Sequence, residues 1–222
     1  MVKDYQIDAI FHLRKIKSTF RKIFELAIPF LQVRQNEIHT YIVYQYALLL
    51  LEDEPGIPEI VIPAAILHDV GWSCIPEEEQ LTAFGPEVKN KQLQRRHEVE
   101  GAAIAMEILN KVRYDPQFSQ KIVEIIDGHD TINKARSIDD AITKDADKLY
   151  RFSGIGFRID YQRFDKEPLP YIRFLFEKID EWFLTNTGKK IAMYQARKRE
   201  KEILQKQQAG FVTNRSGIRL RA

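Results

Sequence analysis

Apolar side chains recur every three or four residues along most of the chain, which is the spacing that places them on one face of an α-helix. The first such stripe consists of Leu13, Ile16, Phe20, Ile23 and Ala27. Proline lacks a backbone N–H and interrupts helices, and Pro29 follows this stripe. We therefore expect an amphipathic helix over about residues 5–27.

The same periodicity predicts seven further helices, bounded by turn and capping residues. Asp53-Glu54-Pro55-Gly56 has the composition of a turn, and Asp115-Pro116 offers an N-cap followed by proline at the first helical position. Pro63 should kink or restart its helix, and Gly154 and Gly156 should end theirs. The expected ranges are about 35–52, 58–70, 92–112, 116–129, 138–152, 169–187 and 189–207.

No segment of any length alternates apolar and polar residues as a strand would, and no internal repeat occurs. The predicted fold class is therefore all-α. Residues 73–90 are polar, contain Pro76 and Gly85-Pro86, and are expected to form a long surface loop. Loops of this length inside a compact domain are often functional lids.

Composition narrows the class of protein. A chain of 222 residues with 44% hydrophobic content can bury one large core. The single cysteine, Cys74, excludes an intrachain disulfide framework and cysteine-rich zinc motifs, and fits a reducing compartment. Neither a membrane-spanning apolar run nor a signal-peptide apolar region is present. We expect a soluble, cytoplasmic protein without a membrane partner.

Charge is distributed unevenly along the chain. Residues 189–222 contain ten Lys/Arg and two Asp/Glu, a local charge of +8, so residues 1–188 carry −6 of the total of +2. We expect a helical core over 1–188 and a basic C-terminal helix and tail over 189–222. Because no aromatic residue interrupts the basic cluster at 197–201, we favour a solvated helix face over a nucleic-acid partner.

Several polar residues occupy positions on the apolar stripes of separate expected helices, where core residues should stand. They are His39, His68, His97, His129 and Asp145. Any one alone could be a core histidine bonded to a carbonyl or a capping aspartate, and His12 does not share the pattern. Because an unpaired buried polar group costs about 1 to 3 kcal/mol, convergence on a metal would give all of them a shared partner. Gly101, on the stripe of His97, would let another backbone approach closely.

These residues resemble the HD-domain metal-dependent phosphohydrolases. The resemblance rests on His39, Leu67-His68-Asp69-Val70-Gly71 and Asp145-Ala146-Asp147-Lys148-Leu149, in the order His, His-Asp, Asp, and covers about residues 30–155. It implies a compact multi-helix HD-type bundle, here with a C-terminal helical extension. It also implies His39, His68, Asp69 and Asp145 as metal ligands, with Asp147 as the alternative for the last position.

The chain departs from the pattern of this family at three points. Many members have an arginine three residues after the first ligand histidine, where Ile42 stands, and others have a lysine soon after the His-Asp pair, where Gly71-Trp72 stands. The Gly-Tyr-Pro signature of the branch that acts on cyclic dinucleotides is absent. We therefore do not expect that specialisation.

Two imidazoles and two carboxylates suit a divalent ion such as Fe, Mn, Ni, Mg or Zn, which would activate water and polarise a phosphoryl oxygen. Asp69 would bridge metal and water or accept the proton of the water. His97 and His129 would either act on the substrate phosphate as catalytic residues or bind a second ion, as in dinuclear relatives. The candidate phosphate-binding residues, adjacent in sequence to these ligands, are Arg95, Arg96, Lys144 and Lys148, which could also be ordinary surface charges.

Three classes of function therefore stay open. We favour a phosphohydrolase that acts on a nucleotide or another small phosphorylated metabolite. The alternatives are a di-iron oxygenase resembling myo-inositol oxygenase, and a metal-binding regulatory module without activity. The sequence also leaves open a homodimer.

Overall fold

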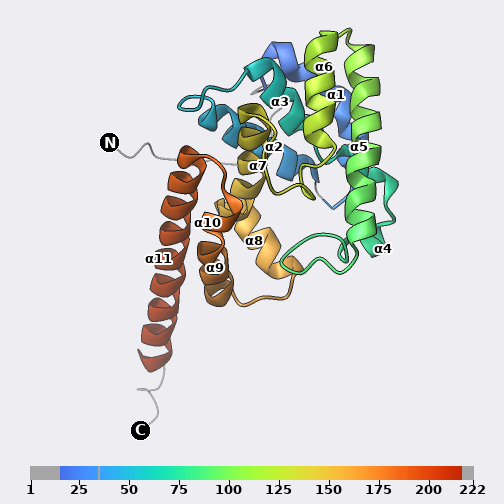
Figure 1. The fold of residues 1–222 in the computed structure, drawn as a ribbon. Coiled ribbons are helices and arrows are strands. Elements are labelled where there is room, and N and C mark those ends of the chain that lie inside the picture. The colour runs from blue at the N-terminus through green and yellow to red at the C-terminus, as the bar shows by residue number, and fades with distance from the viewer. Residues whose placement is uncertain (1–15, 35, 217–222) are drawn as a thin grey trace.

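A computed structural model describes residues 16–34 and 36–216, with side chains as far as residue 208. Within these residues the chain forms α-helices and short 3₁₀ helices, and no strand (Figure 1). The prediction of an all-α fold is thus confirmed. No helix in the described part of the chain is both long and apolar enough to span a membrane.

The elements follow one another in this order along the chain. They are α1 (Ser18–Leu31), α2 (Asn36–Leu50), α3 (Pro58–Leu67), the 3₁₀ helix η2 (Val70–Cys74), α4 (Glu77–Gln80), α5 (Lys91–Lys111), α6 (Pro116–Ile126), α7 (Ile138–Leu149), the 3₁₀ helix η3 (Tyr150–Phe152), α8 (Gly154–Arg163), α9 (Pro168–Glu177), α10 (Ile179–Trp182) and α11 (Asn186–Ser216).

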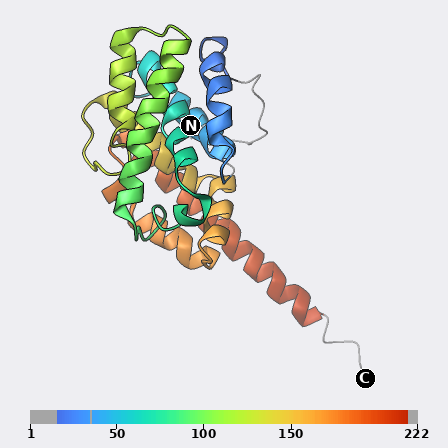
Figure 2. The same cartoon turned by 90° about the vertical axis from the view of Figure 1, so that its right-hand side faces the viewer.

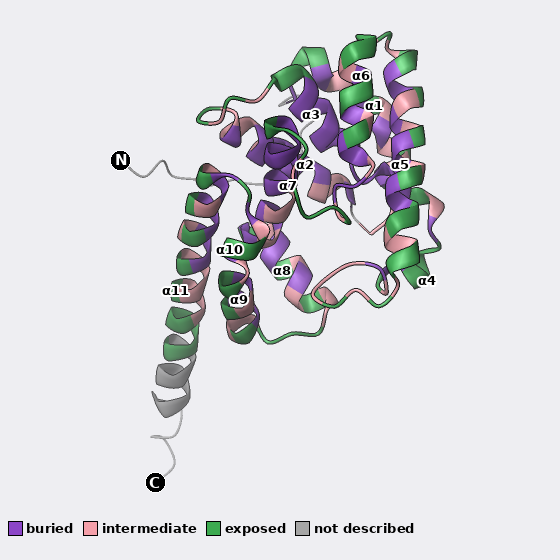
Figure 3. Ribbon diagram, in the orientation of Figure 1, coloured by how far each residue is buried: buried purple, intermediate pink, exposed green. Residues whose placement is uncertain are grey.

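Helix α3 lies within one group of helices, in which α1, α2, α6 and α7 pack against it (Figures 1 and 3). All of its residues from 60 to 67 are buried. A helix that is apolar on every side must be enclosed on every side, which explains this position. The His-Asp pair follows α3 directly, so the fold delivers His68 and Asp69 to the interior of the bundle.

Pro63 lies inside α3 and does not divide it, so the helix does not restart there as one of our two expectations had it. Proline has no N–H to donate to the carbonyl of Glu59, four residues earlier. The hydroxyl of Tyr114, in the connection from α5 to α6, donates to this carbonyl at 2.7 Å. The fold thus supplies the hydrogen bond that the helix lacks.

The backbones of η2 and α5 approach each other closely. A Cβ atom on Gly71 would lie 1.9 Å from the carbonyl oxygen of His97 and 2.5 Å from the amide nitrogen of Gly101. Only a residue without a side chain fits there. The expectation that Gly101 admits another backbone is therefore confirmed, and this contact places His97 close to the end of α3.

Two expectations about helix ends and loops are wrong in detail. Helix α1 continues through Pro29 to Leu31, while residues 5–15 of the expected helix lie outside the described residues. Segment 73–90 contains the short helix α4 and is not only a surface loop. Gln80 is buried there and donates through its amide nitrogen to the carbonyls of Trp72 and Ile75, at 3.0 and 2.7 Å.

The last third of the chain differs most from expectation. Gly154 begins α8, whose N-cap is Ser153 with its side chain accepting from the Gly156 N–H, and this helix was not predicted. The single helix expected over 169–187 is divided into α9 and α10. Helix α11 packs against α9 and α7 along its first half, and its C-terminal part extends away from the other helices (Figure 2). The domain boundary at residue 188 stays a prediction.

Candidate metal centre

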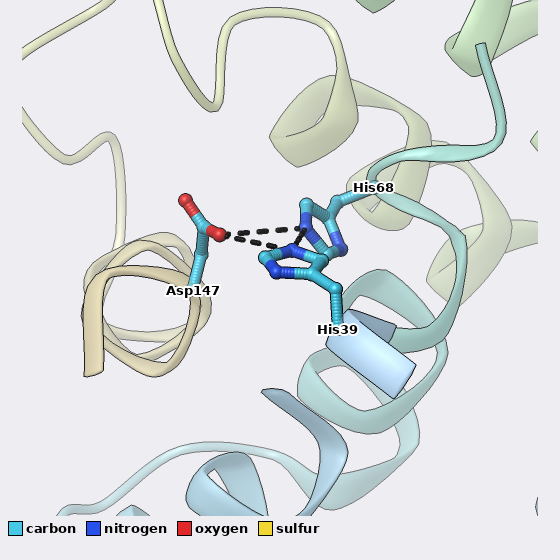
Figure 4. Close-up of side chains that lie close together, drawn as sticks. All are labelled: His39, His68 and Asp147. Atoms are coloured by element: carbon cyan, nitrogen blue, oxygen red, sulfur yellow. Dashed lines mark hydrogen bonds and ion pairs between the residues drawn. The ribbon is translucent and has the colours of Figure 1, made fainter. Parts of the chain in front are cut away.

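His39, His68 and Asp147 meet at one point from three helices or helix ends (Figure 4). His39 lies on α2, His68 follows α3, and Asp147 lies on α7. The Nε2 atoms of the two histidines are 3.0 Å apart. The Asp147 Oδ1 atom is 3.2 Å from Nε2 of His39 and 3.6 Å from Nε2 of His68.

A second group consists of His97 on α5 and of His129 and Asp130 just after α6. The two Nε2 atoms are 3.3 Å apart. The Asp130 Oδ2 atom is 3.7 Å from Nε2 of His97 and 4.0 Å from Nε2 of His129. Both histidines are almost completely buried.

The carboxylate of Asp69 connects the two groups. Its Oδ1 atom lies 3.6 Å from Nε2 of His68 and 3.6 Å from Nε2 of His129. Its Oδ2 atom lies 3.3 Å from Nε2 of His39. The indole N–H of Trp72 donates to Oδ1 at 3.0 Å and so fixes the orientation of the carboxylate.

Helix ends set the orientation of two imidazoles. The Nδ1 atom of His68 lies 3.0 Å from the carbonyl oxygen of Ala65, and Nδ1 of His129 lies 2.9 Å from that of Ile126. The last carbonyls of a helix have no partner within the helix, and a carbonyl can only accept. Nδ1 therefore donates to the carbonyl, and each Nε2 faces the centre, where the neutral imidazole can bind a metal ion.

Aromatic packing holds His97. The Trp72 ring stacks on its imidazole, with ring centroids 4.0 Å apart and planes 11° apart. The guanidinium of Arg34 lies 4.6 Å from the Trp72 centroid and 4.1 Å from that of Phe84, which is within cation–π range. Trp72 thus contacts both groups of ligands, because it also donates to Asp69.

The electrostatic environments of the two buried histidines differ. Burial lowers the pKa of His97 to about 4, and the neighbouring His129 adds to this effect. Burial also acts to lower the pKa of His129, but Asp69 and Asp130 outweigh it and raise that pKa to about 10. Burial disfavours the charged forms of Asp69 and Asp147, yet the facing imidazoles hold the pKa of both carboxyls well below the usual range.

The donor set fits a divalent cation. In each group the Nε2 atoms of the two histidines face each other, at 3.0 Å in one group and 3.3 Å in the other. At most one proton can lie between the two atoms of each pair. One cation in each group would satisfy the imidazole lone pairs and the carboxylate oxygens together. Imidazole with carboxylate is a ligand set suited to Fe, Mn, Ni, Mg or Zn.

Asp145 does not join these groups, which corrects the sequence-based assignment. Its carboxylate accepts from the N–H groups of Leu184 and Thr185, both at 2.8 Å, and from the Thr185 hydroxyl at 2.7 Å. It is fully buried beside the start of α11. Asp147, the alternative ligand, occupies the position expected for Asp145.

Arg95 and Arg96 line neither of the two pockets that contain candidate metal ligands, so the structure gives no support to their predicted role in phosphate binding. Arg95 pairs with Glu98 at 2.8 Å and with Asp127 at 2.5 Å. Glu98 in turn accepts from the N–H groups of Asp130 and Thr131 at 2.9 and 2.8 Å. Arg95 therefore supports the loop that carries His129, while Arg96 is exposed and lies near Glu100.

Lys144 and Lys148 both line a pocket of about 300 Å³ that includes His129, Asp130 and Asp147. Lys144 is buried; its Nζ lies 3.1 Å from Asp140 and donates to the Ile132 carbonyl at 2.8 Å, so its charge is balanced within the protein. Lys148 is half-buried and remains a candidate for contact with a substrate.

Sequence reasoning did not identify Asp130, Arg151 or Arg163 as site residues. Asp130 and both arginines line a smaller pocket of about 50 Å³, together with His39, Asp69 and Asp147. Two signals were present in the sequence. Asp130 directly follows a candidate ligand, and Arg151 comes four residues after Asp147, the spacing of neighbours on a helix face.

Comparisons with known proteins identify the family and support the fold. A model of the HD domain family matches residues 36–151. The crystal structure of a predicted HD superfamily hydrolase from an uncultured Thermotogales bacterium is similar, with a TM-score of 0.55 and 21% sequence identity over 87% of this chain and 91% of that chain. Comparison with curated proteins gives no match. Since the family model covers more than half of the chain and its range contains both ligand groups, the chain belongs to the HD domain family.

Proposed function

We propose that this protein is a metal-dependent phosphohydrolase that acts on a nucleotide or another small phosphorylated metabolite. The observation that carries the proposal is the meeting of four imidazole Nε2 atoms and three carboxylates at pockets that also contain cationic side chains. Membership of the HD domain family supports the same class of reaction.

The residues divide into two ligand sets that share Asp69. His39, His68 and Asp147 would hold one divalent ion, and the set of His97, His129 and Asp130 would hold a second. Bound ions of this kind lower the pKa of water and polarise a phosphoryl oxygen. Because the two oxygens of Asp69 face histidines of both groups, we favour a bridging role for Asp69 over proton acceptance.

The larger pocket has the volume of a small-molecule site, about 300 Å³. Lys148 and Arg151 supply positive charge on its wall, while Phe84 and Trp182 supply apolar surface for the rest of a substrate. In the hydrolysis, a bond forms between water oxygen and phosphorus, and the bond from phosphorus to the leaving oxygen breaks. The proton of the water ends on the leaving group, giving an alcohol and inorganic phosphate.

The direct test combines elemental analysis of purified protein with a screen of nucleotides and sugar phosphates for phosphate release. We expect turnover that chelation abolishes and added metal restores. Oxygen consumption with an iron-dependent visible spectrum would instead favour an oxygenase. Bound metal with neither activity would favour a regulatory module.

A further inference from the structure

Two guanidinium groups lie on the same small pocket as the proposed metal ligands. Arg151 belongs to η3, and Arg163 is the last residue of α8. Both line the pocket of about 50 Å³ that contains His39 and Asp147. Arg151 also lines the larger pocket, so it stands where the two pockets adjoin.

Asp160 holds both arginines in place. Its Oδ2 atom accepts from Nη1 of Arg151 at 2.7 Å, and its Oδ1 atom lies 3.8 Å from Nη1 of Arg163. Asp160 is buried on α8, and the Tyr171 hydroxyl donates to it at 3.4 Å. Arg163 is fixed a second time, because its Nη2 donates to the Arg34 carbonyl at 3.0 Å.

Only one of the carboxylates on this pocket pairs with the two arginines: Asp160 serves both guanidinium groups. The other three, Asp69, Asp130 and Asp147, face the histidines and would be taken up by the metal ions. With those three assigned to the metal ions, one positive charge of the arginine pair is left without a carboxylate. The guanidinium of Arg34 lies over the same Phe84 ring as that of Arg163. It makes no ion pair within the described part of the chain, and Asp69 is the carboxylate that attracts it most. By contrast, Arg95 and Lys144 have acidic partners. An anion in the pocket would complete the charge balance, and a guanidinium retains further N–H donors after pairing once.

We propose that Arg151 and Arg163, positioned by Asp160, form the subsite that binds the phosphoryl group of the substrate next to the metal ligands. This inference rests on the proposed function for the identity of the anion. A planar guanidinium binds phosphate oxygens in pairs, which suits a small pocket that a phosphate group would fill. Arg151 contacts both the reacting group and the body of the substrate, because it lines both pockets.

The test measures binding of inorganic phosphate to the metal-loaded protein by calorimetry. We expect Arg151→Gln to weaken phosphate binding at least about tenfold, the scale of one charge-assisted hydrogen bond, with metal content unchanged. Arg163→Gln should weaken it in the same direction. Arg96→Gln is the matched control, because Arg96 is exposed and lines neither pocket, and its affinity for phosphate should equal that of the wild type.

Unchanged phosphate affinity in both pocket variants would overturn the inference, as would a wild-type protein that carries metal and does not bind phosphate. If Arg151→Gln does not fold, Arg163→Gln decides. The proposed function fails separately: a wild type that binds phosphate through Arg151 without turning over any phosphate ester retains the anion subsite and refutes only the hydrolase. If the wild type turns over a phosphate ester and both variants bind phosphate as tightly as the wild type, the hydrolase stands and the anion subsite is refuted.

Discussion

At the scale of single residues, two aspartates on α7 show how position on a helix decides chemistry. Asp145 and Asp147 are two residues apart, so their side chains leave the helix about 200° apart. Asp145 lies on the apolar stripe with Ile142 and Leu149 and bonds to the backbone before α11, whereas Asp147 faces the histidines. The stripe faces the core, and the ligand therefore lies on another side of α7.

This difference predicts opposite outcomes for two matched substitutions. Asp147→Asn should reduce bound metal and phosphatase activity by at least about tenfold, because an amide is a poor replacement for an anionic ligand. Asp145→Asn should keep the metal but lower the melting temperature, because it disturbs a buried carboxylate that accepts three hydrogen bonds. Elemental analysis and thermal unfolding of both proteins check the pair; metal loss in Asp145→Asn alone would reverse our assignment.

The raised pKa of His129 predicts how the metal-free protein responds to alkaline pH. The folded pKa of about 10 exceeds the ordinary value of 6.5, so the protonated imidazole stabilises the fold fully below pH 6.5 and this contribution is lost as pH rises to 10. In chelator, the free energy of unfolding should fall over this window by at most about 1.4 kcal/mol per pH unit from this group.

Chemical denaturation at several pH values measures this effect, and His129→Gln is the control. The variant should lose the part of the pH dependence that His129 causes. Metal-loaded wild type should also show less of it, because a ligand imidazole is already deprotonated. If the free energy of unfolding falls equally steeply with pH in metal-free wild type and in His129→Gln, the carboxylates do not stabilise a charged His129.

At the scale of helices and their contacts, the junction of η2 with α5 positions three proposed ligands, His68, Asp69 and His97. Gly71 follows Asp69 by two residues and meets α5 one turn after His97, at Gly101. A side chain on Gly71 cannot be accommodated by rotation, because the atoms it would meet belong to the backbone. The spacing between the two ligand groups therefore depends on this glycine.

Gly71→Ala should separate η2 from α5, lower stability by several kcal/mol, on the scale of overpacking in a core, and weaken metal binding. Gly101→Ala is the milder control, since the nearest atom to its added Cβ would be 3.3 Å away. Thermal unfolding and metal content of the two variants provide the measurement. A Gly71→Ala protein as stable as wild type would mean that the two backbones do not approach so closely.

Helical periodicity predicted the elements whose burial follows one stripe, and it failed where other forces decide. Helices α2, α5 and α6 begin and end near the expected residues, because apolar spacing and caps define them. Helix α8 contains the two glycines, Gly154 and Gly156, that suggested a helix end, because a Ser153 cap starts a new helix there. Pro63 lies inside α3 because Tyr114, distant in the sequence, supplies a hydrogen bond that local sequence cannot reveal.

At the scale of the whole molecule, the site is formed where residues more than a hundred positions apart in sequence meet around α3. The sequence indicated His39, His68, His97 and His129, because a histidine on an apolar stripe is conspicuous. It indicated Asp69 through the His-Asp pair that resembles the HD-domain phosphohydrolases. It could not separate Asp145 from Asp147, since that depends on where α11 begins. Arg151 and Arg163 were missed because their role depends on how α8 and Asp160 lie against the pocket.

The central claim is that these side chains hold divalent ions in two adjoining sets. The most direct measurement is anomalous diffraction from crystals of the protein loaded with Mn²⁺. We predict one peak between His39, His68, Asp69 and Asp147, and a second between Asp69, His97, His129 and Asp130. Absence of a peak at both sets in a metal-loaded crystal, or peaks only elsewhere, would contradict the account.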